Sequence, residues 1–308
     1  MAAWRGFFVG DDVHVSVWSN GMRDEHSGST IVLPRRIAMA TMHGKERVLR
    51  PSFAEIGIEL VMPSDLDTDQ FGTFTRERPR AGTMLDSARA KAIAAIEATG
   101  LKAALASEGA YGPHPTVPFL AAGRELLLFV DAALGFEVAE MTIDEDPSFG
   151  HCQVASVDEA SDFLRRIGFP QQGVIVAPAG RLKQPVAKSI RTPEALDAAI
   201  LAATRQSETG EAHIETDMRA FMNPRRMEVI GRLGTSLTAR LATLCPHCRH
   251  PGWGRIRTER GLPCSLCGSP TSLPRHDVFG CVSCDAEERH ALSAGGLADP
   301  SYCPLCNP

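Results

Sequence analysis

Eight of the nine cysteines in the chain lie between position 245 and its end, and they form four Cys-x-x-Cys pairs. A turn of this kind directs two thiolates toward one metal ion, and two turns complete a tetrahedral zinc site. Four thiolates per ion leave no open position for water, so such sites are structural. We therefore predict two structural zinc ions, whose ligands are Cys245, Cys248, Cys264, Cys267, Cys281, Cys284, Cys303 and Cys306.

The four pairs can be combined in two ways. Segment 249–263 separates the first pair from the second, and segment 285–302 separates the third from the fourth. A short hairpin can span either segment. We favour this sequential combination, a double zinc ribbon, over an interleaved one in which the first pair meets the third. A disulfide framework is the remaining alternative. The first residues lack the apolar core of a secretion signal, so we expect a cytoplasmic protein whose thiols stay reduced.

A second group of candidate residues lies where a strand predicted at 37–40 runs into a helix predicted at 45–55. The free amides at the start of a helix and a lysine ammonium converge in such a turn, and both attract phosphate. A glycine-containing turn with a solvated lysine is the alternative interpretation. The residues that could bind substrate here are Thr41, His43, Gly44 and Lys45.

A long polar loop follows between 64 and 83, and it is rich in both carboxylates and arginines. Carboxylates suit magnesium and guanidinium groups suit phosphate, so this composition fits a metal-bound polyphosphate. Asp69 lies in this loop, and Asp86 and Arg89 lie at the start of the helix that follows it. A solvated charged loop is the alternative.

Two further polar segments follow predicted strands. Glu108 and His114 come after an apolar strand at 103–106, and ligands of open α/β sheets gather at the carboxyl ends of strands. Glu108 could therefore hold a metal ion and His114 could contact the substrate. Arg219 and Asn223 lie in a later cluster of alternating charge, which could equally be the solvated entry of a helix.

The elements that must position these residues alternate along the chain, which indicates an α/β fold with a central mixed sheet flanked by helices on both faces. Strands are predicted at 37–40, 58–62, 103–106, 126–130, 136–141 and 173–177. Helices are predicted at 45–55, 84–99, 157–167, 193–205 and 224–244. We expect three parts, namely an irregular leader at 1–30, an α/β domain at 31–242 and a small double zinc-ribbon module at 243–308.

Composition narrows the classes of function. Hydrophobic residues make up 44% and charged residues 22%, which is usual for a globular protein. No run approaches the roughly 18 apolar residues of a membrane span, so we expect a soluble protein without a membrane partner. The formal net charge of −5 gives no global reason to expect nucleic-acid binding. The oligomeric state is left open, with a homodimer among the alternatives.

Two resemblances add to this interpretation. Segments such as ATMHGKE, ASEGAYGPHP and HIETDMRAFMNPRRM resemble an uncharacterised bacterial family with a cysteine-rich tail. More distantly, residues 37–141 resemble the inosine-triphosphate-pyrophosphatase-like superfamily, especially its branch of non-canonical purine nucleoside triphosphatases. That resemblance rests on Thr41 and Lys45, on Asp69-Gln70, on the Ala-x-x-Lys-Ala pattern at 88–92 and on Ser107-Glu108-Gly109.

The superfamily resemblance implies a metal-dependent hydrolase of a nucleoside triphosphate or a related phosphorylated nucleotide. In that scheme carboxylates hold Mg²⁺ or Mn²⁺, a lysine grips phosphate and arginines offset developing charge. The carboxylates are Asp69, Asp86 and Glu108, the phosphate is bound by Thr41 and Lys45, the arginines are Arg89 and Arg219, and the substrate pocket is completed by His43, Gly44, His114 and Asn223.

Two other functions are kept beside this one. The first is a non-catalytic protein that binds a nucleotide-like ligand and uses its zinc ribbons to engage nucleic acid or protein. The second is a zinc hydrolase in which His43 and His114 are ligands, although the sequence has no His-x-x-x-His helix pairing that would support it.

Overall fold

The computed structural model describes residues 31–308 except 73–79, 81, 293 and 294. The described chain divides into two compact units. One contains residues 35–129 and 140–235, and the other contains 31–34, 130–139 and 236–308. In this part of the chain, every helix falls short of the length and apolar character that crossing a bilayer requires.

A five-stranded sheet forms the centre of the first unit, and its strand order is β2 (Glu59–Val61), β1 (Arg36–Ala40), β3 (Ala103–Pro113), β4 (Ala121–Asp131) and β5 (Phe136–Asp144). Strand β1 is parallel to both of its neighbours, β2 and β3. Residues 37–40 of β1 and 103–109 of β3 are buried throughout, as expected of strands covered on both faces. Strands β4 and β5 form a hairpin, and its end, 130–139, belongs to the second unit.

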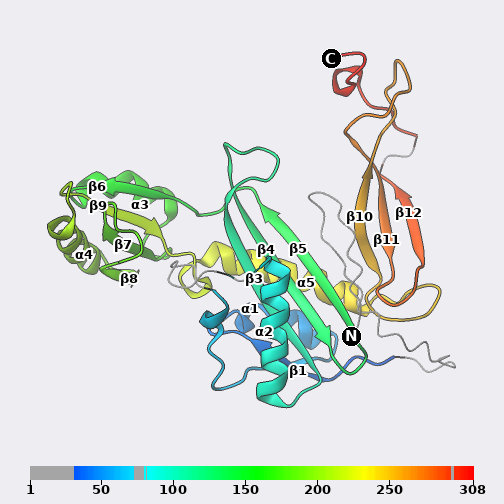
Figure 1. The fold of residues 1–308 in the computed structure, drawn as a ribbon, viewed down its shortest axis with the longest axis horizontal. Coiled ribbons are helices and arrows are strands. Elements are labelled where there is room, and N and C mark those ends of the chain that lie inside the picture. Colours follow the sequence, from blue (N-terminus) through cyan, green and yellow to red (C-terminus); the bar gives the residue numbers. More distant parts are fainter. Residues whose placement is uncertain (1–30, 73–79, 81, 293–294) are drawn as a thin grey trace. The chain divides into compact units, whose positions relative to one another are not determined.

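Helix α2 (Met84–Thr99) crosses β1 and β3 on one face of this sheet (Figure 1). It has the bounds predicted from the sequence. Thr83 and Asp86 form a capping box at its start, and Gly100 ends it in the left-handed conformation with φ of 68°. These local signals are strong enough to determine the bounds of the helix without any tertiary contact.

Two more helices, α1 (Glu46–Glu55) and α5 (Pro224–Ala242), pack together in this unit. The contact uses glycines of α5, because a Cβ at Gly234 would collide with the side chain of Leu49 on α1. The predicted helices at 45–55 and 224–244 are therefore present, with slightly shorter bounds.

A second, four-stranded sheet lies in the same unit, and all of its neighbouring strands are antiparallel. Helices α3 (Ser161–Ile167) and α4 (Pro193–Gln206) pack on it around Phe163, Val174 and Leu196. Only one of its strands was predicted, at 173–177. The strand order is β6 (His151–Val154), β9 (Ala212–Thr216), β7 (Val174–Pro178) and β8 (Ala187–Ile190). The mixed α/β class is thus confirmed. The structure adds a second sheet, two strands of which, β6 and β8, are short and mostly exposed or half-buried.

The cysteine-rich unit is built on a three-stranded antiparallel sheet of β10 (Gly254–Arg260), β11 (Pro274–Gly280) and β12 (Glu287–Ala291). The end of the β4–β5 hairpin packs within this unit. Arg240 donates to the carbonyl oxygens of Gly252 at 3.2 Å and Ala139 at 3.1 Å. These hydrogen bonds join the end of α5, the hairpin and the cysteine-rich segment into one body.

Candidate functional site

A cavity of about 390 Å³ opens in the first unit, at the carboxyl end of β1 and along residues 107–111 of β3. Its walls come from the turn after β1, from β3, from α2 and from segments near the four-stranded sheet. Positive side chains dominate the lining, and they are Lys45, Arg80, Lys91, Lys188 and Arg219. Among the described lining residues Glu108 is the one acidic side chain, so the cavity is suited to an anion.

Lys45 lies in the turn between β1 and α1, where the sequence predicted it. Gly44 has φ of 70°, a conformation that glycine adopts without a steric penalty, and this lets the chain turn into the helix. The Nζ of Lys45 is buried and donates to the carbonyl oxygen of Ser107 at 3.3 Å and to its Oγ at 3.1 Å. Within the described residues Lys45 forms no ion pair. Burial, followed by the charge of Arg226, lowers its pKa to about 7.

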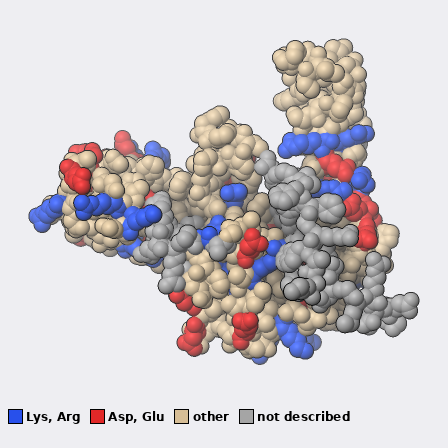
Figure 2. Space-filling view, in the orientation of Figure 1, with Lys and Arg blue, Asp and Glu red and all other residues tan. Residues whose placement is uncertain are grey.

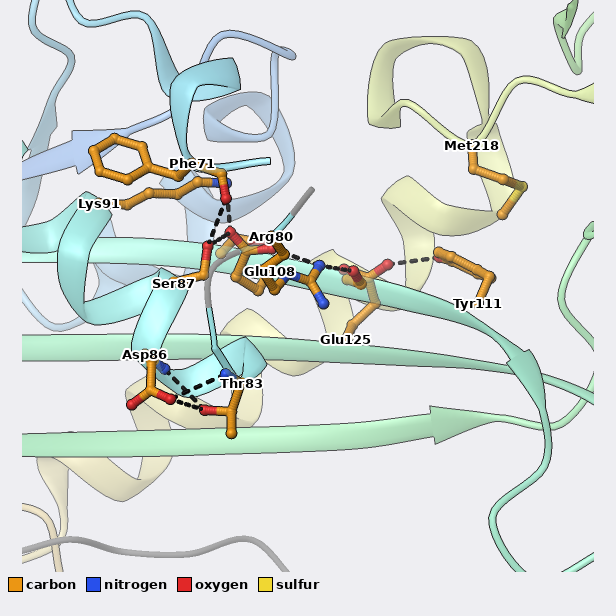
Figure 3. A network of polar contacts seen from close by, with 12 residues as sticks. Phe71, Arg80, Thr83, Asp86, Ser87, Lys91, Glu108, Tyr111, Glu125 and Met218 are labelled. Atoms are coloured by element: carbon orange, nitrogen blue, oxygen red, sulfur yellow. Dashed lines mark hydrogen bonds and ion pairs between the residues drawn. The ribbon is translucent and has the colours of Figure 1, made fainter. Parts of the chain in front are cut away.

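Glu108 lies on β3 and is enclosed by cations (Figure 3). One oxygen contacts Lys91 and accepts a hydrogen bond from Ser87 Oγ at 3.0 Å, and the other is 2.9 Å from Arg80. Although burial acts to raise it, the charges of Lys91, Lys45 and Arg80 hold the pKa of Glu108 below its usual value. Because both oxygens already have cationic or hydroxyl partners, the carboxylate serves to position Lys91 and Arg80 at the cavity wall.

A buried ion pair supports β3 beside the cavity. Arg226 Nε lies 2.6 Å from Glu125 Oε1, and the Tyr111 hydroxyl donates to the same oxygen at 2.6 Å. A Cβ at Gly109 would lie 2.8 Å from that oxygen and still closer to Arg226. Glycine is therefore required at 109, which explains the Ser-Glu-Gly motif on the strand.

Arg219 reaches the cavity from the segment after β9. Its Nε donates to Asp217 Oδ1 at 2.9 Å and one terminal nitrogen donates to Ser189 Oγ at 2.8 Å, which fixes the direction of the guanidinium group. The group lies 4.9 Å from the centre of the Phe221 ring, and the ring of His43 lies 5.4 Å from the same ring. Burial and the nearby charge of Lys45 lower the pKa of His43 to about 4, so this imidazole is neutral at pH 7.

The structure brings together five of the predicted site residues at the cavity, namely Thr41, His43, Lys45, Glu108 and Arg219. Gly44 shapes the turn between them. The sequence analysis included Lys91 and Ser107 in motifs without giving them a role, and it did not single out Lys188. A lysine on the otherwise small and apolar buried face of α2 was the signal for Lys91, whereas Lys188 had no local signal at all.

Two predicted residues at the start of α2 have another local role. The carboxylate of Asp86 accepts from the backbone nitrogen of Thr83 at 3.0 Å and from its hydroxyl at 2.7 Å, and Figure 3 shows it turned to Thr83. Arg89 lies 3.5 Å from Asp86. Asp86 therefore caps the helix, and neither side chain is among the described residues that line the cavity.

His114 and Asn223 also organise the backbone. His114 Nδ1 accepts from the backbone nitrogens of Thr116 at 3.2 Å and Val117 at 3.1 Å. Asn223 Oδ1 accepts from the backbone nitrogen of Arg226 at 2.9 Å, at the start of α5. The side chain of Asp69 lies outside the described residues. Where the structure describes the chain, three or more potential metal ligands converge only at cysteines, so Asp86, Glu108, His43 and His114 belong to no such group of described residues.

The cysteines form two groups of four, and each can hold a zinc ion. The first pair joins the third, with Cys248 Sγ 3.5 Å from Cys281 Sγ. The second pair joins the fourth, with Cys267 Sγ 3.6 Å from Cys303 Sγ. The combination is therefore interleaved, and the sequential one that the spacing favoured is wrong.

The hairpin of β10 and β11 explains this outcome. Gly254, at the start of β10, pairs with Gly280, at the end of β11, so the cysteines before β10 meet those after β11. The second pair lies at the opposite end of the hairpin. There a bridge between Cys264 and Ala298 brings back the last segment of the chain. Strand β10 lies between the first two cysteine pairs in the sequence, and it places them at opposite ends of the hairpin.

Comparison with known proteins adds a family to this geometry. No curated protein and no solved structure matched the chain. A family model described as "Domain of unknown function (DUF6671)" matches residues 91–308. The match includes Lys91, Glu108, Arg219 and both cysteine groups, and it begins after the turn that carries Lys45. Because more than half of the chain is matched, the protein belongs to this DUF6671 family.

Proposed function

We propose that the cavity binds a phosphorylated small molecule, with Lys45 and its cationic neighbours holding the phosphate. The observation that carries the proposal is the environment of Lys45. This buried amine has a hydroxyl and a carbonyl oxygen as hydrogen-bond partners, and it forms no ion pair among the described residues. A buried lysine without a carboxylate partner is unfavourable unless an anion completes its surroundings.

The charge of the remaining wall supports the same ligand class. Glu108 offsets part of the charge of Lys91 and Arg80, and Asp217 offsets part of that of Arg219. Lys188 and Lys45 add to the total, so positive charge exceeds negative charge around the cavity. A phosphate would restore the balance, and it would raise the pKa of Lys45 by stabilising the ammonium. Guanidinium groups add the planar donors that match phosphate oxygens.

The finer function in this proposal is hydrolysis of a nucleoside triphosphate or a related phosphorylated nucleotide. It is supported by the order of motifs along 37–141, since Thr41, Lys45 and Glu108 all come to one cavity. The carboxylates of Asp86 and Glu108 have other partners, so the proposal assigns the neutralisation of phosphate charge to lysine and arginine side chains. These contacts favour a reaction in which lysine and arginine side chains, and not metal-binding carboxylates, stabilise the phosphate charge.

In this proposal the two cysteine groups hold zinc ions with a structural role. On the sheet beside them two of the arginines already have carboxylate partners, because Arg257 lies 2.7 Å from Glu287 and Arg289 lies 3.0 Å from Glu259. Figure 2 shows positive and negative side chains intermixed on this unit. Such a surface does not favour nucleic acid, whose binding requires unpaired positive charge.

Calorimetric titration of the full chain with pyrophosphate and with adenosine and inosine triphosphates tests the binding. Lys45→Met should lower the affinity for pyrophosphate at least tenfold, since it removes one charged hydrogen bond from a buried site. Lys102→Met is the matched control, because Lys102 is exposed in the same unit. Absence of binding to the wild type, or an equal loss in both variants, would overturn the proposal.

Release of phosphate and pyrophosphate from the same nucleotides, measured with Mg²⁺ and with a chelator, tests the hydrolysis. Turnover that persists after chelation would support charge neutralisation by the side chains. Turnover that requires the metal would restore the carboxylates to the mechanism, and binding without turnover would leave a ligand-binding protein.

A further inference from the structure

Ser107 occupies an unusual position for a serine on a buried strand. Its residue is 2% exposed, yet its atoms line the cavity together with Lys45. Its Oγ lies 3.1 Å from Lys45 Nζ, within the distance over which a proton can be transferred. A hydroxyl and an amine that meet at the wall of an anion-binding cavity form the first two members of a nucleophilic site.

The other described hydroxyl groups at the cavity lack this neighbour. Tyr111 donates its hydroxyl to Glu125 at 2.6 Å. Thr41 accepts a hydrogen bond from the backbone nitrogen of His43 at 3.3 Å, in the turn itself. Thr68 also lines the cavity, and among these described hydroxyls Ser107 is the one hydrogen-bonded to an amine.

We propose that Ser107 is a nucleophile for phosphoryl transfer and that Lys45 is its general base. This inference rests on the proposed function, because it requires a phosphorylated ligand in the cavity. It goes beyond that function by naming a covalent intermediate, a phosphoserine at 107, and by giving Lys45 a second role besides charge.

The steps balance as follows for a phosphoanhydride. Ser107 Oγ forms a bond to phosphorus as the bond from phosphorus to the leaving phosphate oxygen breaks, and the hydroxyl proton passes to Lys45 Nζ. The leaving group departs as an anion and needs no proton. Water then attacks the phosphoserine, the bond from phosphorus to Oγ breaks, and the Lys45 ammonium returns its proton to Oγ. Inorganic phosphate keeps both protons of the water molecule.

The surroundings fit each step. In the empty cavity a pKa of about 7, which follows from burial and from the charge of Arg226, leaves a substantial fraction of Lys45 as free amine at neutral pH, before the phosphoryl donor binds. Arg80, Lys91 and Arg219 line the same cavity and can offset charge on the phosphoryl oxygens. His43 stays neutral because its pKa is about 4, so it does not repel the ammonium that forms.

Acetyl phosphate is the probe for this inference, since it is a small phosphoryl donor whose leaving group needs no proton. The full chain is mixed with it, quenched in acid, digested and examined by mass spectrometry. We expect one added phosphoryl group on the peptide that contains Ser107 and none in Ser107→Ala. Ser52→Ala is the matched control, because Ser52 is buried in α1 and donates to Leu49 at 3.1 Å.

Lys45→Arg separates the two roles of the lysine. Arginine keeps the positive charge but supplies no free base at neutral pH. In this variant labelling by acetyl phosphate should fall at least tenfold more than the affinity for pyrophosphate does. At low acetyl phosphate concentration, where the rate reports the pKa of the unliganded protein, wild-type labelling should rise as the pH increases through about 7, which provides a second measurement if the arginine does not fit.

Three results would overturn the inference. Equal labelling of Ser107→Ala and the wild type would exclude the nucleophile, and a labelling rate independent of pH between about 6 and 8 would exclude the base. Pyrophosphate binding without any label on Ser107 would reject the inference while leaving the proposed function intact. Loss of both binding and labelling in the wild type would instead reject the proposed function.

Discussion

Arg226 and Glu125 form an ion pair in the interior of the first unit, with Nε and Oε1 2.6 Å apart and both side chains 1% exposed. The pair joins α5 to β4, the neighbour in the sheet of the strand that carries Ser107 and Glu108. Tyr111 shares the carboxylate, and the carbonyl oxygen of Met218 accepts from the guanidinium group. The network therefore holds the wall of the cavity in place by satisfied polar contacts rather than by apolar packing.

Breaking this pair should be costly. Glu125→Ala leaves a buried guanidinium group without its carboxylate, and we expect a loss of about 3–5 kcal/mol in the free energy of unfolding. Arg36→Ala is the control, since Arg36 and Glu59 are 3.4 Å apart but exposed, and it should cost less than about 1 kcal/mol. Urea denaturation measures both. Equal losses would show that the buried network does not stabilise the unit.

The interleaved cysteine groups predict a distinctive zinc content. The double variant Cys245→Ser, Cys281→Ser damages one group, so the purified protein should lose one of its two zinc ions. The double variant Cys245→Ser, Cys264→Ser damages both groups and should lose both ions. Elemental analysis of the full chain gives the ratio. The reverse pattern would indicate the sequential combination.

Lys45 should destabilise the fold at neutral pH. Burial lowers its pKa from 10.5 to about 7, so between these values the unfolded chain binds a proton that the folded chain does not. Stability from this group therefore rises with pH across that window. We expect Lys45→Met to be more stable than the wild type at pH 7, by several kcal/mol in order of magnitude, and the difference to fall by roughly half near pH 9.

Denaturation at the two pH values, without phosphate in the buffer, measures this difference. Lys102→Met should change stability by less than about 0.5 kcal/mol at either pH, because Lys102 is exposed. A difference between Lys45→Met and the wild type that does not vary with pH would show that Lys45 titrates normally.

The variant Asp86→Ala distinguishes a structural role of this carboxylate from a catalytic one. Its carboxylate accepts two hydrogen bonds from Thr83 at the start of α2, so Asp86→Ala should cost about 0.5–2 kcal/mol of stability. Thr83→Ala should cost a similar amount because it removes the same capping box. Neither change should alter pyrophosphate affinity more than about twofold. A selective loss of nucleotide turnover in Asp86→Ala, with stability unchanged, would support the metal-ligand role instead.

Local features of the fold could be predicted from the sequence because they depend on neighbouring residues. Thr83, Asp86 and Gly100 determine both ends of α2 through capping and a left-handed glycine. The apolar run at 37–40 and the glycine after it place Lys45 in the turn between a strand and a helix. Strands β6 and β8 of the second sheet escaped prediction, because they are short and mostly exposed or half-buried, and so lack a clear apolar pattern.

The sequence by itself determined which side chains could do chemistry, and the tertiary structure decided which of them meet. Eight cysteines in four pairs indicate two zinc sites, but the pairing of β10 with β11 selects the partners by separating pairs that are adjacent in the sequence. In the same way Lys91 neutralises Glu108 from a helix, and Arg219 reaches the cavity from a distant segment. Spacing along a chain limits how far apart two residues can be, whereas sheet register and helix packing determine how close they come.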